Sequence, residues 1–426
     1  MNKTLAWAFY DWANSAFATT VMAGFFPVFF KQYWSVGTDV NLSTFKLGAA
    51  NSLAGVLVAV MAPVLGAIAD RGGARRKFLF FFAAMGVVMT GALYLVAEGR
   101  WALAVGVYVT AIVGFSGANV FYDSLLVVVA PEPRRDFVSA LGFSLGYLGG
   151  GVLFALNVFM TLKPRLFGLA DVTQAVRWSF LSVAVWWAVF SIPLLVWVKD
   201  TETPDRARGW SAVTGGFRQL SATFHEIRKF RMAALFLLSY WLYIDGVDTI
   251  IRMAVDFGLS LGFQSSSLML ALLITQFVGF PAAIGFGKIG EKLGPKTGIF
   301  IGLAVYLGVT LWGYFMTTET EFYVLAAVIG LVQGGVQALS RSFYARLVPA
   351  RRAAEFFGFY NMLGKFAAVI GPFLMGWVGL LTGSSRLSIL SIAALFILGG
   401  LLLHRVDEEE GRRAAREFEE AFNAER

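Results

Sequence analysis

Long apolar segments separated by short polar stretches make up almost the whole chain. A helix that crosses a bilayer needs roughly 20 apolar residues, and twelve segments have about this length. They are too long and too uniformly apolar to be the alternating strands of a membrane barrel. The pattern therefore predicts twelve transmembrane helices, near residues 5–33, 45–69, 78–97, 101–129, 137–160, 176–198, 232–257, 266–287, 297–317, 322–346, 356–381 and 386–404.

The two halves of the chain repeat one another. The longest internal polar stretch, 199–231, separates six predicted helices from six. Residues 114–143 align without gaps on 330–359, so that Ser124 meets Ser340. Parallel six-helix repeats are typical of transporters whose two halves rock around a central site. We therefore predict an all-α membrane protein with two pseudo-symmetric six-helix bundles.

The polar stretches divide the chain into four parts. We expect an N-terminal bundle over 1–198, a cytoplasmic linker over 199–231, a C-terminal bundle over 232–404 and a charged cytoplasmic tail over 405–426. The second part of the linker places apolar side chains on one helical face, which is typical of a helix lying on the membrane surface. The tail indicates no particular function.

The composition agrees with a membrane protein and disfavours several kinds of site. The chain is 58% hydrophobic and only 15% charged, whereas a soluble domain carries about a quarter charged residues. It has no cysteine, and its two histidines, His225 and His404, lie in or beside polar segments. We therefore expect no disulfide, no metal site and no other cofactor. No nucleophile–base pair is evident either, so an enzyme is not expected.

Positive charges are distributed unevenly between the loops. The loops on one side carry 25 of the 35 lysines and arginines, and those on the other side carry seven. Such an excess marks the cytoplasmic side, so we expect both termini in the cytoplasm and the protein in a bacterial inner membrane. The net charge of +8 then reflects topology rather than nucleic-acid binding. The first apolar segment is too long for a signal peptide and lacks a small-residue cleavage site.

A short basic turn, 66–77, joins the second and third predicted helices. A fainter copy, 287–296, joins the eighth and ninth. We expect the turn to act as a cytoplasmic latch that holds one face of the protein closed and releases it during cycling. The expected gating residues are Gly66, Asp70, Arg71, Gly73, Arg75 and, in the copy, Glu291.

The same turn resembles the signature of the major facilitator superfamily, G-x-L-A-D-R-x-G-R-K, with Ala74 where an arginine is usual. A narrower resemblance covers nearly the whole chain. Residues 10–20 (YDWANSAFATT), 337–342 (QALSRS) and 355–361 (EFFGFYN) are similar to the vacuolar effluxer-like branch of that superfamily. The resemblance implies the major facilitator fold and secondary transport. Fungal members of the branch export amino acids from the vacuole, so the resemblance also implies amino-acid export.

Charged residues inside membrane helices are costly, so each one is a candidate for function. Asp245 lies about half-way along the seventh predicted helix, a suitable depth for a substrate or proton site. Asp248, Arg252 and Asp256 follow at four-residue spacing and share one helical face. A functional role for these three competes with a self-satisfied ladder of ion pairs.

Two other helices carry polar candidates. Asp11 and Asn14 lie one turn apart on the first helix, where Asp11 either lines the cavity or only pairs with a loop arginine. Lys365 is near mid-depth of the eleventh helix, too deep to reach the membrane surface. We expect it to pair with an intramembrane aspartate or to bind a substrate carboxylate.

Two charged residues lie near the cytoplasmic ends of their helices. Arg341 is on the tenth helix and Asp123 on the fourth, each about two turns from the end. They are candidates for transport roles. The alternative is that they are latches between helices, in which Arg341 pairs with Glu291 and Asp123 pairs with Arg71 or Arg75.

These features together predict a secondary active transporter that works by alternating access. Acids on helices one and seven facing a lysine on helix eleven would suit a zwitterion such as an amino acid. No ATP-binding loop is evident, so we expect export driven by an ion gradient, with protons as the coupling ion. The expected partners are a small-molecule solute, protons and the lipid bilayer, and the protein is expected to be a monomer. The alternatives are a drug/proton antiporter for amphiphilic compounds and a non-transporting membrane receptor.

Overall fold

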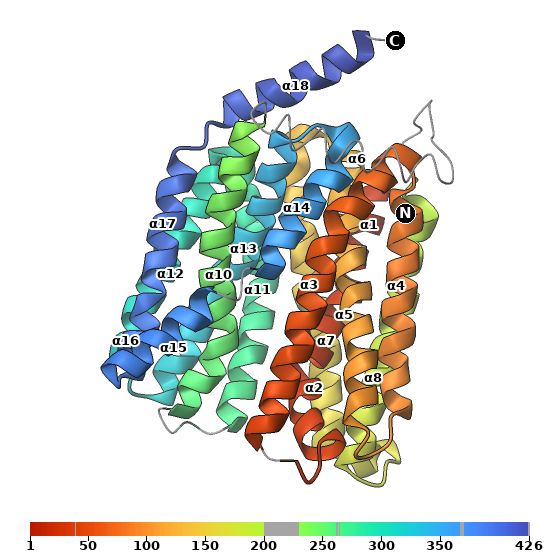
Figure 1. The fold of residues 1–426 in the computed structure, drawn as a ribbon, viewed down its shortest axis with the longest axis vertical. Coiled ribbons are helices and arrows are strands. Elements are labelled where there is room, and N and C mark those ends of the chain that lie inside the picture. The colour runs from red at the N-terminus through yellow and green to blue at the C-terminus, as the bar shows by residue number, and fades with distance from the viewer. Residues whose placement is uncertain (39, 200–229, 261–262, 264, 367–369, 425–426) are drawn as a thin grey trace.

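The computed structural model describes residues 1–38, 40–199, 230–260, 263, 265–366 and 370–424. Within these ranges all regular structure is helical. Figure 1 shows long helices running side by side, with the two halves of the chain next to one another. The predicted linker, 199–231, lies outside the described residues apart from its ends, so its surface helix stays a prediction.

The N-terminal half, residues 3–197, contains six apolar spans. The first span begins as an α-helix and continues through wider π-helical turns. The elements of this half are α1 (Lys3–Ala16), η1 (Phe17–Phe25), α2 (Phe26–Phe29), η2 (Phe30–Trp34), α3 (Val40–Gly72), α4 (Arg75–Ala92), η3 (Leu93–Leu95), α5 (Trp101–Ser124), α6 (Leu126–Val129), η4 (Glu132–Arg134), α7 (Arg135–Leu162), η5 (Pro164–Phe167) and α8 (Val172–Trp197).

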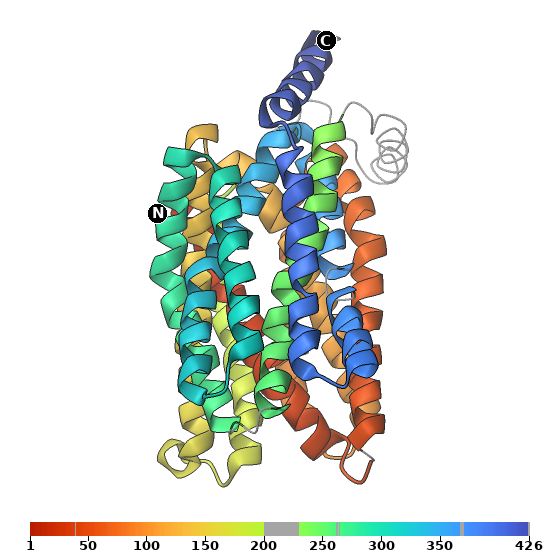
Figure 2. The same cartoon turned by 90° about the vertical axis from the view of Figure 1, so that its left-hand side faces the viewer.

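The C-terminal half, residues 231–404, repeats this arrangement and is followed by a helix outside the bundle (Figure 2). Its elements are α10 (Arg231–Ser260), α11 (Ser265–Leu293), α12 (Pro295–Phe315), α13 (Glu319–Leu347), η6 (Ala350–Arg352), α14 (Ala353–Phe366), α15 (Ile370–Thr382), α16 (Ser385–Ser391), α17 (Ala393–His404) and α18 (Glu408–Ala424).

Eleven helices of the described chain are long and apolar enough to cross a membrane. The predicted eleventh span, 356–381, contains two described helices, α14 and α15, and residues 367–369 between them are not described. At the start of α15 the N–H groups of Ile370 and Gly371 donate to the carboxylate of Asp245 in α10. Pro372 follows directly, in the first described turn of α15, where proline is tolerated.

The structure retains a trace of the internal repeat in the two basic turns. Gly73 and Gly294 are equivalent in the repeat, and both have positive φ angles, 54° and 84°. Gly73 lies two residues before α4, and Gly294 lies directly before α12. Glycine adopts this backbone conformation without a steric penalty, so the same residue type closes the same turn in both halves.

The two halves pack closely at one end of the bundle, which we call the basic end. It is the end at which the turn 70–75 and the segments η4 and η6 lie, and α18 lies beyond it (Figure 1). At this end a side chain added to Gly66 of α3 would clash with the carbonyl of Ala354 in α14. The Ser139 hydroxyl donates to the Ala338 carbonyl at 2.7 Å, from α7 to α13. The two halves are therefore in direct contact at the basic end.

Candidate functional site

A cavity of about 380 Å³ lies between the two halves. It is lined by α1, η1, α5 and α7 of the N-terminal half and by α10, α11, α13 and α14 of the C-terminal half. Its wall contains the amide side chains of Asn14, Asn119, Gln276, Gln333, Gln337 and Asn361. The charged residues in the wall are Asp11, Asp123, Asp248 and Arg341. Such a wall suits a polar solute.

Arg341 lies at the basic end of this cavity and is only 2% exposed. Its Nη1 is 3.1 Å from Asp123 Oδ1 and 3.5 Å from Asp11 Oδ2. Its Nε donates to the Ser139 hydroxyl at 2.9 Å, and its Nη2 donates to the Ser139 carbonyl at 2.8 Å. One arginine of the C-terminal half is therefore held by three residues of the N-terminal half.

Both carboxylates have further hydrogen-bond donors. The Tyr122 hydroxyl donates to Asp11 Oδ2 at 2.8 Å, and Asn361 Nδ2 donates to Asp123 Oδ2 at 2.9 Å. These hydrogen bonds fix the positions of both carboxylates in the cavity wall. Two carboxylates nevertheless share one guanidinium, so one negative charge is left over when both are ionised. A proton or a cationic group of a solute would be stabilised at this place.

Aromatic rings enclose the guanidinium of Arg341. Its Cζ lies 4.9 Å from the ring centre of Trp7, 5.3 Å from that of Tyr122 and 4.3 Å from that of Phe143. The faces of such rings attract cations. The indole of Trp7 is itself fixed, because its N–H donates to the Tyr122 carbonyl at 2.8 Å. The arginine is thus held in a rigid pocket.

Asp245, predicted as a substrate or proton site, is a residue of α10 whose side chain contacts the start of α15. Its carboxylate accepts hydrogen bonds from the backbone N–H groups of Ile370 and Gly371, both at 2.9 Å, and from Thr249 at 3.2 Å. It is completely buried, and the wall of the central cavity includes its neighbour Asp248 instead. The carboxylate is therefore placed as a cap on the first described turn of α15.

The remaining predicted site residues divide into two groups. Asp248 and Asn14 line the cavity, and Asn14 donates to Asn119 at 2.7 Å. The side chains of Arg252, Asp256 and Lys365 are not among those that the structure describes, so the ion ladder and the binding role of Lys365 stay predictions.

The pairing partners differ from those expected. Asp11 pairs with Arg341, which lies inside a span, rather than with a loop arginine. Arg341 pairs with Asp11 and Asp123 rather than with Glu291. The sequence could not indicate these partners, because the residues come from opposite halves and meet only when the halves pack together.

The basic turn contacts the other half directly. Asp70 Oδ1 accepts from Arg75 Nε at 2.7 Å and from the backbone N–H of Ala354 at 3.2 Å. Its Oδ2 accepts from the N–H of Glu355 at 2.9 Å. Asp70 thus caps the first turn of α14, where a negative charge is favourable. We call this group, Asp70, Arg75 and the first turn of α14, the clasp.

Arg75 adds to the clasp from the start of α4. Its Nη2 donates to the Ala350 carbonyl at 2.7 Å and to the Arg351 carbonyl at 3.3 Å. The side chain of Arg71 is not described. Glu291, the counterpart of Asp70 in the copy, is exposed. The copied turn therefore differs from the clasp, and the gating role of both turns stays a prediction.

Several cavity residues were not singled out from the sequence. Ser139, Tyr122, Asn119 and Gln276 all contact the predicted residues or line the cavity. For Asn119 and Gln276 the available signal was an amide side chain inside an apolar segment. Amides are less conspicuous than charges, and the residues of a helix that face the cavity cannot be told from those that face a neighbouring helix.

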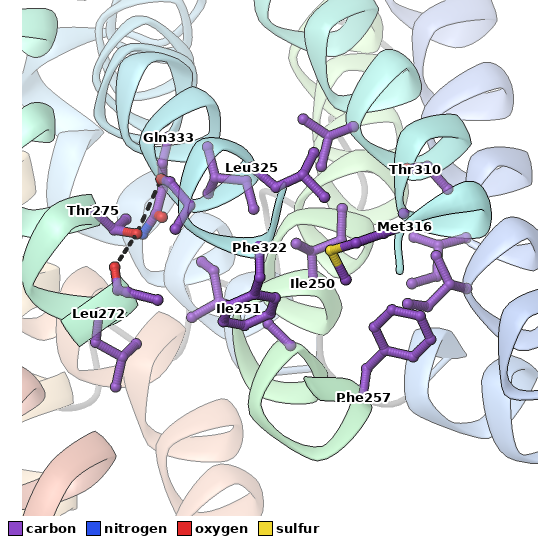
Figure 3. Close-up of a pocket in the computed structure, with 18 of the residues that line it drawn as sticks. Ile250, Ile251, Phe257, Leu272, Thr275, Thr310, Met316, Phe322, Leu325 and Gln333 are labelled. Carbon is purple, nitrogen blue, oxygen red and sulfur yellow. Dashed lines mark hydrogen bonds between the residues drawn. The ribbon is translucent and has the colours of Figure 1, made fainter. Parts of the chain in front are cut away.

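A second, smaller cavity of about 100 Å³ lies within the C-terminal half. Figure 3 shows apolar side chains around it, including Ile251, Phe257 and Phe322, with Gln333 at one side. Gln333 also lines the central cavity. Its Oε1 is buried and has no hydrogen-bond partner within the described part of the chain. The smaller, apolar cavity therefore adjoins the central, polar cavity at Gln333.

A family model described as "Vacuole effluxer Atg22 like" matches residues 34–416. The chain belongs to the Atg22-like vacuole effluxer family. This Atg22-like chain is 41% identical over 406 residues to the uncharacterized MFS-type transporter YxiO of Bacillus subtilis, covering 95% of this chain and 94% of that protein. It is 26% identical to Autophagy-related protein 22 of Yarrowia lipolytica, covering 90% and 79% of the two chains.

Solved structures agree on the fold. The human organic anion transporter MFSD10 superposes with a TM-score of 0.71 at 15% identity, covering 94% of this chain and 99% of that one. The proton:xylose symporter XylE superposes with a TM-score of 0.69 at 14% identity, covering 96% and 95%. The Atg22-like chain therefore has the major facilitator fold. It is an integral, multi-pass membrane protein and a secondary transporter rather than an enzyme, as predicted.

Proposed function

We propose that this Atg22-like transporter exports a small zwitterionic solute, such as an amino acid, in exchange for protons. The observation that carries the proposal is the central cavity between the halves, whose wall contains amide side chains, three acids and one arginine. A volume of about 380 Å³ is in the range of small-ligand sites. The polar wall can replace the water lost by the solute's charged groups.

A zwitterion needs both signs of charge in one site. The carboxylates of Asp11, Asp123 and Asp248 lie in the wall and suit an ammonium group, because charge-assisted hydrogen bonds are the strongest ones. The amide N–H groups of the wall suit a carboxylate. Lys365, whose side chain is not described, is the predicted second partner for that carboxylate.

Proton coupling is proposed for the acids that share Arg341. Opening the basic end must separate Arg341 from Asp11 and Asp123, because they belong to opposite halves. Separating the pairs forfeits the attraction between Arg341 and the two carboxylates. A proton on one of the acids removes part of this attraction. Protonation would therefore favour opening of the basic end, and release of the proton would favour its closure.

The family description supports export as the direction of transport, and a structural neighbour supports protons as the coupling ion. The family description names effluxers, and one structural neighbour is a proton:xylose symporter, so this fold can use protons. With both termini cytoplasmic in a bacterial plasma membrane, the basic end would face the cytoplasm. The clasp would then close the cytoplasmic side, and a monomer would suffice for the cycle.

The test is a solute panel on proteoliposomes with and without a pH gradient. The panel contains zwitterionic amino acids, sugars and amphiphilic cations. The proposal requires that at least one zwitterion moves and that the gradient accelerates it. If no solute moves under any imposed gradient, the receptor alternative is favoured instead.

A second candidate, a drug/proton antiporter, has one observation in its favour. The apolar cavity adjoins the polar one at Gln333, so an amphiphile could place its charged end in one and its apolar end in the other. The same panel separates the two candidates. Movement of amphiphilic cations without movement of any amino acid would favour the antiporter.

A further inference from the structure

The C-terminal helix α18 is a folded, docked element. The Asp407 carboxylate caps it by accepting hydrogen bonds from the N–H groups of Glu409 and Glu410, at 2.9 and 3.0 Å. Gly411 and Ala415, one turn apart, are buried. Figure 1 shows that the helix begins beside the basic end of the bundle and extends beyond it. The face of α18 that contains Gly411 and Ala415 therefore packs against the rest of the protein.

The apolar face of α18 is anchored to the C-terminal half. The Phe418 ring centre lies 5.7 Å from that of Phe230 and 5.4 Å from the guanidinium carbon of Arg352. Glu419 Oε1 accepts a hydrogen bond from the N–H of Ala350 at 2.6 Å. Because Ala350 and Arg352 belong to the C-terminal half and Phe230 directly precedes α10, α18 should move together with that half.

A line of alternating charges connects α18 to the N-terminal half. Arg346 of α13 pairs with Asp136 of α7, and its other nitrogen lies 3.3 Å from Glu408 of α18. Glu408 also pairs with Arg412 at 2.8 Å, and Arg412 lies 3.5 Å from Glu132 of η4. The line starts and ends on the N-terminal half, so it crosses between the halves twice, once through α13 and once through α18.

We propose that α18 is a strap that stabilises the closed state of the basic end. The inference rests on the proposed alternating access, in which the halves separate at this end. Separation breaks the Arg346–Asp136 pair and the Arg412–Glu132 pair, while the anchors of α18 remain intact. Loss of α18 removes the second link and also the contact of Glu408 with Arg346. The open state should then be more populated, and the effect should be modest because Arg412 and Glu132 are 24% and 50% exposed.

The test measures the conformation directly, without a transported solute. The chain has no cysteine, so two exposed positions at the basic end on opposite halves, Arg134→Cys and Lys292→Cys, can carry spin labels in the full-length protein in liposomes. Pulsed electron paramagnetic resonance then gives the ratio of long to short distances. Arg412→Gln should raise this ratio about two- to five-fold, and removal of 407–426 should raise it at least as much.

A matched variant distinguishes the strap from a general loss of charge. Arg413→Gln makes the same change at an exposed neighbouring position of the same helix and should leave the ratio unchanged. An unchanged ratio in Arg412→Gln, or the same rise in Arg413→Gln, would overturn the proposal even if the truncated chain does not fold. Because no solute is involved, a wrong substrate assignment would not affect this result.

Discussion

The guanidinium of Arg341 lies 3.1 Å from the carboxylate of Asp123, although the two residues belong to opposite halves of the chain. The same nitrogen lies 3.5 Å from Asp11. This shared arginine is at the basic end of the central cavity, where the halves are packed together. Any motion that opens this end must break both pairs. Protonation or solute binding at these residues in the cavity would therefore affect the closure of the basic end.

Replacing Arg341 by Gln should destabilise the protein and abolish coupled transport. The change leaves Asp11 and Asp123 buried without their cation, which costs about 3–5 kcal/mol when one partner of a buried pair is removed. The apparent melting temperature in detergent and solute efflux from proteoliposomes both measure this. Arg177→Gln, a partly buried arginine that donates to the Tyr94 carbonyl, is the control. Wild-type stability in Arg341→Gln would contradict the assigned role.

Replacing Asp123 by Asn should uncouple transport from the proton gradient. Asparagine resembles the protonated acid, so Arg341 loses one of its anions permanently while the hydrogen-bond geometry is largely kept. Efflux should continue in the variant. A pH gradient that accelerates efflux by the wild type several-fold should leave the efflux rate of the variant unchanged. Glu98→Gln alters an exposed acid elsewhere and should retain the full gradient effect. A normal gradient effect in both Asp123→Asn and Asp11→Asn would rule out this pair as the proton site.

Asp245 allows a test between a helix cap and a proton site. As a cap, it holds the N–H groups of Ile370 and Gly371. Asp245→Ala should then lower the free energy of unfolding by about 1–3 kcal/mol for each donor left unsatisfied. Asp245→Asn keeps one acceptor oxygen and should lose less stability while preserving the gradient effect. If Asp245→Asn instead removes the gradient effect, the proton site is at Asp245, as the sequence alone suggested.

The clasp can be opened by adding bulk at Gly66. A side chain there would meet the Ala354 carbonyl and lie 2.8 Å from the Cα of Glu355, so Gly66→Leu should force α3 and α14 apart. The spin-label pair Arg134→Cys and Lys292→Cys should then report mainly long distances. Gly55→Leu is the control on the same helix, because a side chain at Gly55 would meet nothing within 4 Å. Equal distance distributions in the two variants would show that the clasp does not keep the basic end closed.

The fold was largely predictable because its determinants are local. Apolar segments of membrane-spanning length and the repeat around the turns at Gly73 and Gly294 were sufficient to predict two six-helix bundles. The binding of Asp245 to the start of α15 was not predicted. The carboxylate accepts from the N–H of Gly371, which is more than 100 residues away along the chain, so no local pattern indicates the contact.

Some residues that line the central cavity were predictable, but their pairing was not. Charges inside apolar segments identified Asp11, Asp248 and Arg341, which do line the cavity. Their partners depend on which helix faces are turned toward one another, and a nearly uniformly apolar helix gives no periodicity from which to read its faces. The same limitation explains why Ser139, which donates to and accepts from the other half, was not singled out.

The central claim is that a zwitterion is exported in exchange for protons through the cavity at Arg341. The most direct measurement is efflux of preloaded amino acids from proteoliposomes, with an imposed proton gradient directed against the solute flow, for the wild type and Asp123→Asn. We expect the gradient to accelerate efflux of at least one amino acid several-fold in the wild type and to have no effect in the variant. Efflux at the same rate with and without the gradient in the wild type, or no efflux of any amino acid, would contradict the claim.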